Sequence, residues 1–197
     1  KSQVLSGGRM KAGGVKFASS AEEARAAAEH ILKLEISGQM PRNVLIESKA
    51  PVKKEYYAGV IYDAIAKLPV AIFSDMGGID IEEVAEKHPE HVARVHFSTF
   101  QPLQEFKFKE LVASLGISGN ELNQLSRIVA RVAKAFLTYG LTLAEINPLA
   151  QLEDGSFIAL DSHCDMEEEA REQQKALLAE LGIGDDETRL ARPPTAF

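Results

Sequence analysis

The chain has 197 residues, 45% of them hydrophobic and 26% charged, which is enough to bury one large core or two small ones. Its net charge of −7 argues against a nucleic-acid-binding protein, because neutralising phosphates requires clustered lysine and arginine. No apolar run approaches the roughly 18 residues of a membrane span, so no membrane contact is expected. The single cysteine, Cys164, excludes an intrachain disulfide and suits a reducing compartment. We expect a cytoplasmic location, or the mitochondrial matrix if the source is a eukaryote.

Residues 1–18 are expected to form a strand, a glycine loop and a second strand over Val15–Ala18. The loop, residues 7–14, holds four glycines together with the cations Arg9 and Lys11. Unobstructed backbone N–H groups beside cations can cover the phosphates of a nucleotide, although a plain glycine-rich hairpin turn is an alternative. Because the chain begins with Lys1 inside a strand, we expect it to be a fragment of a longer polypeptide.

The middle of the chain predicts alternating helices and short strands. Ser19 and Ser20, followed by Glu22 and Glu23, indicate the start of a helix that runs to Leu34. Runs rich in Val, Ile, Tyr and Phe predict a three-stranded meander, then a turn, a short helix and another strand. Apolar spacing of i, i+3, i+4 predicts two long helices. In order, these elements are residues 43–48, 55–63, 70–74, 76–80, 81–87, 93–97, 104–115 and 120–139.

The last strand pair is expected to be a hairpin with a three-residue loop, Glu153-Asp154-Gly155, and Gly155 in the left-handed conformation. This register places Asn147 opposite Asp161. Strict alternation then puts Glu145, Asn147 and Asp161 on one face with Leu149, and puts Ile146, Pro148, Ala150, Leu152, Ile158 and Leu160 on the core face. Two carboxylates and an amide oxygen form the hard-oxygen set that Mg²⁺ prefers, although a solvated polar face is the simpler alternative.

The residues after the hairpin carry no clear chemistry of their own. Cys164 follows His163, but the partners of a catalytic cysteine meet in space rather than in sequence, so neither residue is assigned a role. Residues 167–181 are expected to form one amphipathic helix that ends at Gly182, and residues 184–197 to form a linker.

Four segments together resemble one known family. Residues 1–14, 47–55, 77–82 and the run Glu145-Ile146-Asn147-Pro148-Leu149 resemble, in order and spacing, the ATP-grasp domain of succinyl-CoA synthetase β subunits. The same domain lies at the N-terminal end of ATP-citrate lyase and malate–CoA ligase β subunits. The resemblance covers nearly the whole chain and implies an α+β fold of the ATP-grasp type, with mixed or antiparallel sheets flanked by helices.

The resemblance also implies roles for ten residues. The nucleotide contacts fall on Lys1, Gly8, Arg9, Met10, Glu47, Ala50 and Glu55, and the magnesium ligands on Asn147 and Asp161. Glu145 matches an acid near the place where a phosphohistidine docks, and is the one residue predicted to be catalytic. Met10 stands where the family has glycine, and Ser162-His163-Cys164 replaces a glycine-led continuation after Asp161.

The implied function is the nucleotide- and Mg²⁺-binding part of an ADP-forming acyl-CoA ligase β subunit. In this family ATP or GTP phosphorylates a histidine on a partner α subunit, which also carries the CoA site, and the phosphoryl group then passes to a carboxylic acid. Two alternatives are an ATP-grasp binding module without catalysis of its own, and another ATP-grasp carboxylate ligase. The fragment alone is expected to be inactive. Its predicted parts are a nucleotide-binding region over 1–140, a metal-binding hairpin and closing helix over 141–182, and a linker over 183–197 towards a CoA-ligase domain.

Overall fold

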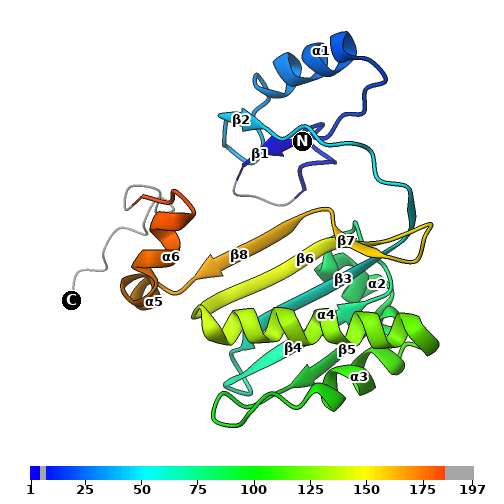
Figure 1. The fold of residues 1–197 in the computed structure, drawn as a ribbon, viewed down its shortest axis with the longest axis vertical. Coiled ribbons are helices and arrows are strands. Elements are labelled where there is room, and N and C mark those ends of the chain that lie inside the picture. The colour runs from blue at the N-terminus through cyan, green and yellow to red at the C-terminus, as the bar shows by residue number, and fades with distance from the viewer. Residues whose placement is uncertain (5–7, 185–197) are drawn as a thin grey trace. The chain divides into compact units, whose positions relative to one another are not determined.

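The computed structural model describes residues 1–4 and 8–184, and the chain divides into two compact units (Figure 1). The first unit comprises residues 1–53 together with 152–154, and the second comprises residues 54–151 together with the chain from 155 onward. The sequence-based division into 1–140, 141–182 and 183–197 follows motifs rather than packing and stays a prediction. Beyond residue 184, its linker lies outside the described residues.

The first unit combines a small sheet with one helix. Strand β1, Ser2–Gln3, pairs antiparallel with β2, Asn43–Val44, and helix α1 spans Ala21–Ile31. The Ser20 hydroxyl accepts a hydrogen bond from the Glu23 N–H at 3.2 Å, and the Glu23 carboxylate accepts one from the Ser19 N–H at 2.7 Å. This reciprocal cap explains where the helix begins and confirms the predicted start signal.

Two strand predictions in this unit are wrong. Val15–Ala18 has no regular structure, because β1 takes Asn43–Val44 as its partner and only the Ser2 N–H reaches back to the Gly14 carbonyl, at 2.7 Å. The predicted strand over 43–48 shrinks to two residues and belongs to this small sheet, so it is not part of a meander with the strands that follow.

The second unit is built on a six-stranded sheet. Its strands run in the spatial order β5-β4-β3-β6-β7, with β8 also paired to β6. The pairs β3–β4, β4–β5, β6–β7 and β6–β8 are antiparallel. The strands are β3 Val52–Asp63, β4 Leu68–Ser74, β5 Val92–His96, β6 Leu141–Leu152, β7 Phe157–Ala159 and β8 Ser162–Met166.

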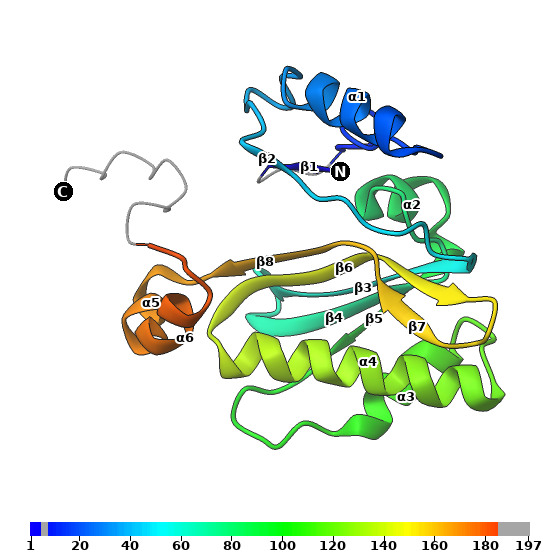
Figure 2. The same ribbon diagram turned by 45° about the horizontal axis from the view of Figure 1, so that its top comes forward.

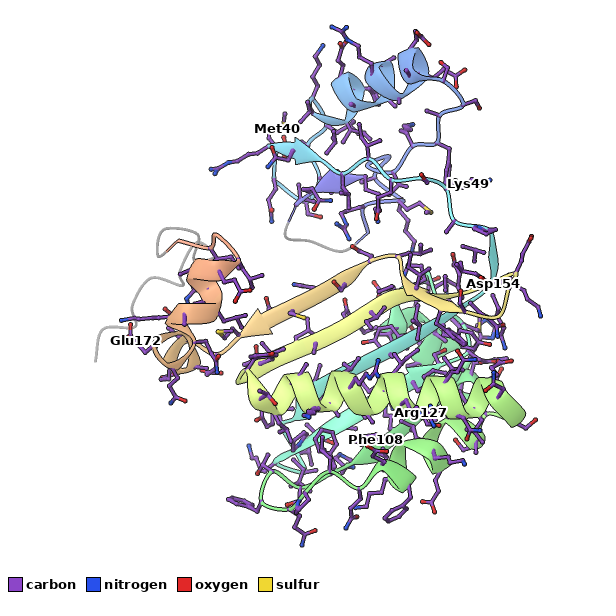
Figure 3. All side chains as sticks on the ribbon, viewed as in Figure 1. Met40, Lys49, Phe108, Arg127, Asp154 and Glu172 are labelled. Atoms are coloured by element: carbon purple, nitrogen blue, oxygen red, sulfur yellow. The ribbon has the colours of Figure 1, made fainter. Side chains whose placement is uncertain are left out.

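Helices cover both faces of this sheet (Figures 1 and 2). On one face, α3 (Glu105–Ala113) and α4 (Gly119–Thr138) pack their apolar sides against Tyr56, Ala58 and Val60 of β3. Phe108 of α3 is fully buried in this core, whereas Arg127 of α4 is exposed (Figure 3). On the other face, α2 (Ile81–Lys87) packs Ile81 against a smaller cluster that includes Tyr57. A short 3-10 helix, Pro89–His91, follows α2.

The end of the described chain differs from its prediction. Residues 167–181 form two short helices, α5 (Glu168–Gln173) and α6 (Lys175–Glu180), instead of one. The break lies at Gln174, whose backbone leaves the helical region and whose side-chain amide donates to the Thr138 carbonyl at 3.3 Å. Strand β8 was not predicted as a separate strand. No described helix is long and apolar enough to cross a membrane.

Candidate functional site

The strand pair that ends the sheet places Asn147 opposite Asp161. Leu149 pairs with Ala159 of β7 and Ile146 pairs with Ser162 of β8, so one register runs along β6 on both sides of Asn147. Between these pairs, the Asn147 N–H donates to the Asp161 carbonyl at 3.1 Å. Gly155 has a φ of +82°, the left-handed conformation that the three-residue loop requires. The predicted loop and register are therefore confirmed (Figure 3 labels Asp154 at the tip).

The predicted core face of this hairpin is right for Ile146 and Ala150, which are packed against the core or buried, and wrong for Leu149 and Ile158. Leu149 is buried and packs with Ala144, Ile146 and Phe157 in the main core, while Ile158 is exposed. Ile146 and Leu149 lie an odd number of residues apart, so the alternation of β6 shifts between them. The shift falls where the partner of β6 changes from β8 to β7. Strict alternation of side chains between the two faces cannot be extended past such a shift.

The Asn147 side chain is held by the loop between β4 and α2. Its Oδ1 accepts a hydrogen bond from the Gly78 N–H at 2.8 Å, and its Nδ2 donates to the Ile79 carbonyl at 2.9 Å. Because the loop supplies one donor and one acceptor, only one orientation of the Asn147 amide satisfies both hydrogen bonds. The second lone pair of Oδ1 is not used by these bonds, so the oxygen keeps acceptor capacity for a cation.

That loop is itself fixed to β3 by two adjacent glycines. The Gly77 N–H donates to the Glu55 carbonyl at 3.0 Å, and a Cβ on Gly77 would lie 2.4 Å from the Tyr56 carbonyl oxygen. Gly78 has a φ of +73°, and its Cβ position lies 2.5 Å from a carboxylate oxygen of Glu55. Glu55, predicted from the resemblance as a nucleotide contact, therefore lies beside the loop that holds Asn147.

Glu145, two residues before Asn147, has its own partners. Its Oε2 accepts a hydrogen bond from the Tyr57 hydroxyl of β3 at 3.0 Å, and its Oε1 lies 3.8 Å from Nδ1 of His163 on β8. Burial, and secondly the charge of Glu145, raise the pKa of Tyr57 well above its usual value, so the phenol stays protonated.

Glu145 and other acidic groups raise the pKa of two further side chains. A hydrogen bond to Asp80 raises the pKa of Glu82, and the charges of Asp80 and Glu145 add to the effect. On β8, burial raises the pKa of Cys164, with the nearby charges of Asp165 and Glu145 contributing. The raised pKa keeps the Cys164 thiol protonated and so disfavours a thiolate.

In the first unit, three of the predicted nucleotide contacts, Lys1, Glu47 and Arg9, have polar partners within the unit. The Lys1 ammonium forms an ion pair with Glu47 at 2.5 Å. Arg9 donates from Nη1 to the Ser2 carbonyl at 3.4 Å, and partial burial lowers its pKa from the usual value. A guanidinium nonetheless stays charged at any physiological pH. Ala50 lies further along, where its carbonyl accepts from the Val52 N–H at 3.0 Å.

The glycine loop is more closed than its composition suggested. Three of its backbone N–H groups are used inside the loop, from Ala12 to Gly8 at 3.1 Å, Gly13 to Met10 at 3.0 Å and Gly14 to Arg9 at 2.8 Å. Those three donors are therefore not directed at a ligand. The Met10 side chain is 65% exposed and so does not fill the interior of the loop. Residues 5–7 of the segment lie outside the described residues.

The donor set around Asn147 fits magnesium better than a transition metal. Asn147 could supply an amide oxygen, and Asp161, opposite it in the register, a carboxylate. Both are hard oxygen ligands, and Mg²⁺ usually keeps several waters and binds substrate phosphates as well. Within residues 1–4 and 8–184, no group of three or more His, Cys, Asp or Glu side chains is arranged to hold a metal ion. Sequence reasoning paired Asn147 with Asp161, but missed Tyr57 and the contact of the Gly77-Gly78 loop with Asn147. The pair of glycines shortly before α2 was the available signal for that loop.

An ATP-grasp domain model matches residues 1–151 of the sequence. The chain belongs to the ATP-grasp family. This confirms the family resemblance and, with it, the expected α+β fold.

Curated relatives of this ATP-grasp chain include a succinate–CoA ligase [ADP-forming] subunit beta from Methanocaldococcus jannaschii, 39% identical over 86% of the chain and 47% of the relative. A succinate–CoA ligase [GDP-forming] subunit beta from Thermus thermophilus is 38% identical over 86% of the chain and 45% of the relative. The chain thus spans about half the length of the curated relatives it matches.

Solved structures support the same fold for this ATP-grasp chain. An ATP citrate lyase from Methanothrix soehngenii, determined with citrate and coenzyme A, superposes with a TM-score of 0.69 over 91% of this chain and 41% of that one, at 21% identity. A dinucleotide forming acetyl-coenzyme A synthetase from Ca. Korarchaeum cryptofilum gives a TM-score of 0.56 over 78% of this chain and 69% of that one, at 17% identity. At such identities the likeness concerns the fold alone.

Proposed function

We propose that this ATP-grasp chain is the nucleotide- and Mg²⁺-binding part of the β subunit of an ADP-forming acid–CoA ligase. The observation that carries the proposal is the pairing of Asn147 with Asp161, with the Asn147 amide oriented by the Gly78 loop. The names of the curated relatives support the same reaction class. One of them is GDP-forming, so the nucleotide is taken as ATP or GTP.

In this proposal, Asn147 and Asp161 hold Mg²⁺, which neutralises charge on the phosphates of the nucleotide. Lys1 and Arg9 supply positive charge to those phosphates. The remaining nucleotide contacts are Gly8, Met10, Glu47, Ala50 and Glu55. The ion pair between Lys1 and Glu47 supports assigning these two residues to one ligand, because it fixes the ammonium beside the acid.

The proposed reaction transfers the terminal phosphoryl group to a histidine of a partner α subunit, then to a carboxylic acid, and CoA finally displaces phosphate. Phosphoryl transfer depends mostly on positioning and on neutralising charge, so this chain needs no nucleophile of its own. Glu145 is the residue that we place near the phosphorylated histidine. The acid substrate and CoA would contact other parts of the full enzyme.

Isothermal titration calorimetry of the chain with Mg-ATP and Mg-GTP tests the binding half of the proposal. Asp161→Ala should weaken Mg-nucleotide binding by more than about tenfold, since losing even an outer-shell partner of a metal costs about 10- to 100-fold in affinity. Glu153→Ala, which removes an acid of the same hairpin at its exposed tip, is the control and should bind as the parent does. Unchanged affinity in Asp161→Ala would contradict the assignment of the metal ligands.

The catalytic half requires the full β subunit with its partner subunit. ADP release that depends on both a carboxylic acid and CoA is the expected result. ADP release that depends on an acid and an amine, without CoA, would instead identify another ATP-grasp carboxylate ligase. Nucleotide binding without any ADP release would leave the chain as a binding module.

A further inference from the structure

Tyr57 lies flat along its own strand, over Gly59. Residues two apart on a strand share a face, so the space above Gly59 lies beside the Tyr57 side chain. A Cβ on Gly59 would lie 2.3 Å from the Tyr57 hydroxyl oxygen, 2.8 Å from Cζ and 2.9 Å from Cε1. The ring therefore occupies the volume that any larger residue at position 59 would fill. Gly59 has no positive φ, so its small size here serves the tyrosine rather than a turn.

This placement of the ring carries the hydroxyl across to the neighbouring strand. Tyr57 is 2% exposed, and its hydroxyl donates to Glu145 Oε2 of β6 at 3.0 Å. The other oxygen of Glu145 faces His163 Nδ1 of β8 at 3.8 Å, and His163 Nε2 lies 3.5 Å from Asp165. The Tyr57 contact is thus the short, directional bond of Glu145, and the contact with His163 is looser. A hydrogen bond to a charged acceptor is roughly twice as strong as one between neutral groups.

The neighbouring tyrosine provides a natural comparison. Tyr56 precedes Tyr57 on β3 and points to the opposite face, where its hydroxyl contacts the Glu121 carboxylate of α4. Each tyrosine is buried and bonded to one carboxylate. Glu121 belongs to a helix of the main core, whereas Glu145 lies two residues before Asn147, beside the proposed metal ligands.

We propose that Gly59 and Tyr57 act together as positioning residues for Glu145, fixing its carboxylate in the orientation in which it meets the phosphorylated histidine of the partner subunit. The proposal rests on the proposed function, and specifically on the role given there to Glu145. Tyr57 itself contacts neither nucleotide nor metal in this scheme, so its removal should lower turnover and leave nucleotide binding unchanged.

The test uses the full enzyme with its partner subunit and the variants Tyr57→Phe, Gly59→Ala and, as the matched control, Tyr56→Phe. In Tyr57→Phe, kcat should fall about 10- to 100-fold, the range expected when a hydrogen bond to a charged group is lost, while KM for the nucleotide is unchanged. Gly59→Ala keeps the hydroxyl but displaces the ring, and should reproduce this split. Tyr56→Phe should retain the parent kcat.

A double variant shows whether Tyr57 acts through Glu145. Once Glu145→Gln has lowered kcat, adding Tyr57→Phe should cause little further loss, because the bond that it removes no longer orients a carboxylate. Additive losses would overturn the proposal, as would a parent-like kcat in Tyr57→Phe.

A crystal structure of the Tyr57→Phe enzyme separates this inference from the proposed function. The Glu145 carboxylate should leave its parent position while the backbone of β6 stays in place. If the parent shows no acid- and CoA-dependent ADP release, the proposed function fails, and the movement of Glu145 still decides whether Tyr57 positions it. A carboxylate that keeps its place without the hydroxyl would overturn the positioning role even in an active enzyme.

Discussion

Replacing Gly77 with alanine should destabilise the second unit by crowding the backbone of β3. The new Cβ would lie 2.4 Å from the carbonyl oxygen, 2.5 Å from the nitrogen and 2.7 Å from the carbonyl carbon of Tyr56. None of these atoms is the end of a flexible side chain, and Tyr56 lies within a central strand, so the loop has to move instead. Overpacking of this kind costs typically about 1–3 kcal/mol. For a chain of this size, 1 kcal/mol corresponds to a Tm change of about 2–4 °C.

Thermal and urea denaturation, followed by circular dichroism, measure this loss, and Mg-ATP calorimetry measures its functional consequence. A displaced loop takes the Gly78 N–H and the Ile79 carbonyl away from Asn147, so binding should weaken together with stability. Gly184→Ala is the control, because a Cβ there meets nothing within 4 Å. A Gly77→Ala chain as stable as the Gly184→Ala chain would refute the steric reasoning. A destabilised variant with parent-like affinity would refute the coupling to Asn147.

Three further outcomes follow from the packing and charges. Phe108→Ala should cost about 3–5 kcal/mol in denaturation experiments, whereas Phe106→Ala on the same helix, 57% exposed, should cost far less. Ser20→Ala should speed hydrogen exchange of the α1 amides by removing a cap worth about 1 kcal/mol, and Ser19→Ala, which keeps its backbone donor, should not. Hydrogen bonds from the Ala66 N–H, His96 and the Ile65 N–H lower the pKa of Asp63 from 3.8 to about 2. The stability that this carboxylate contributes is therefore present above pH 3.8 and lost as pH falls through about 2. Asp63→Asn should flatten that part of the acid denaturation curve.

Local signals predicted the fold well where they act over a few residues. The Ser20 cap, the glycine after the hairpin turn and the i, i+3, i+4 spacing of α4 each depend on neighbours in sequence, and each was confirmed. The hairpin register also followed from loop length, because one left-handed glycine fixes the pairing of all later residues.

Features that depend on distant partners were predicted poorly. Val15–Ala18 has the composition of a strand, but among the described residues, 1–4 and 8–184, no strand pairs with it. The core face of the hairpin was wrong for Leu149 and Ile158 because the alternation shifts between Ile146 and Leu149, and residue types alone do not reveal such a shift. At the break between α5 and α6, the Gln174 side chain contacts Thr138, 36 positions away, and local spacing carries no information on such a contact.

The candidate site likewise has a part that local sequence predicts and a part that depends on distant residues. Asn147 and Asp161 could be paired from the sequence because a single short loop separates their strands. The hydrogen bonds from Gly78 to Asn147 and from Tyr57 to Glu145 join residues 69 and 88 positions apart, and periodicity carries no information at such separations. Only the folded sheet, with β3 beside β6, shows that these side chains meet.

The two adjacent tyrosines of β3 also make the sheet convenient to observe. The chain has no tryptophan and only four tyrosines, two of which are Tyr56 and Tyr57. Each phenol is bonded to a carboxylate, an arrangement that quenches tyrosine emission, and each lies on a different face of the same strand. Release of these two phenols from their carboxylates should therefore raise ultraviolet emission above the background from Tyr62 and Tyr139, and this rise reports the opening of the strand. Substituting one tyrosine at a time would assign the signal to the helical core or to the side that carries Glu145, without any attached dye.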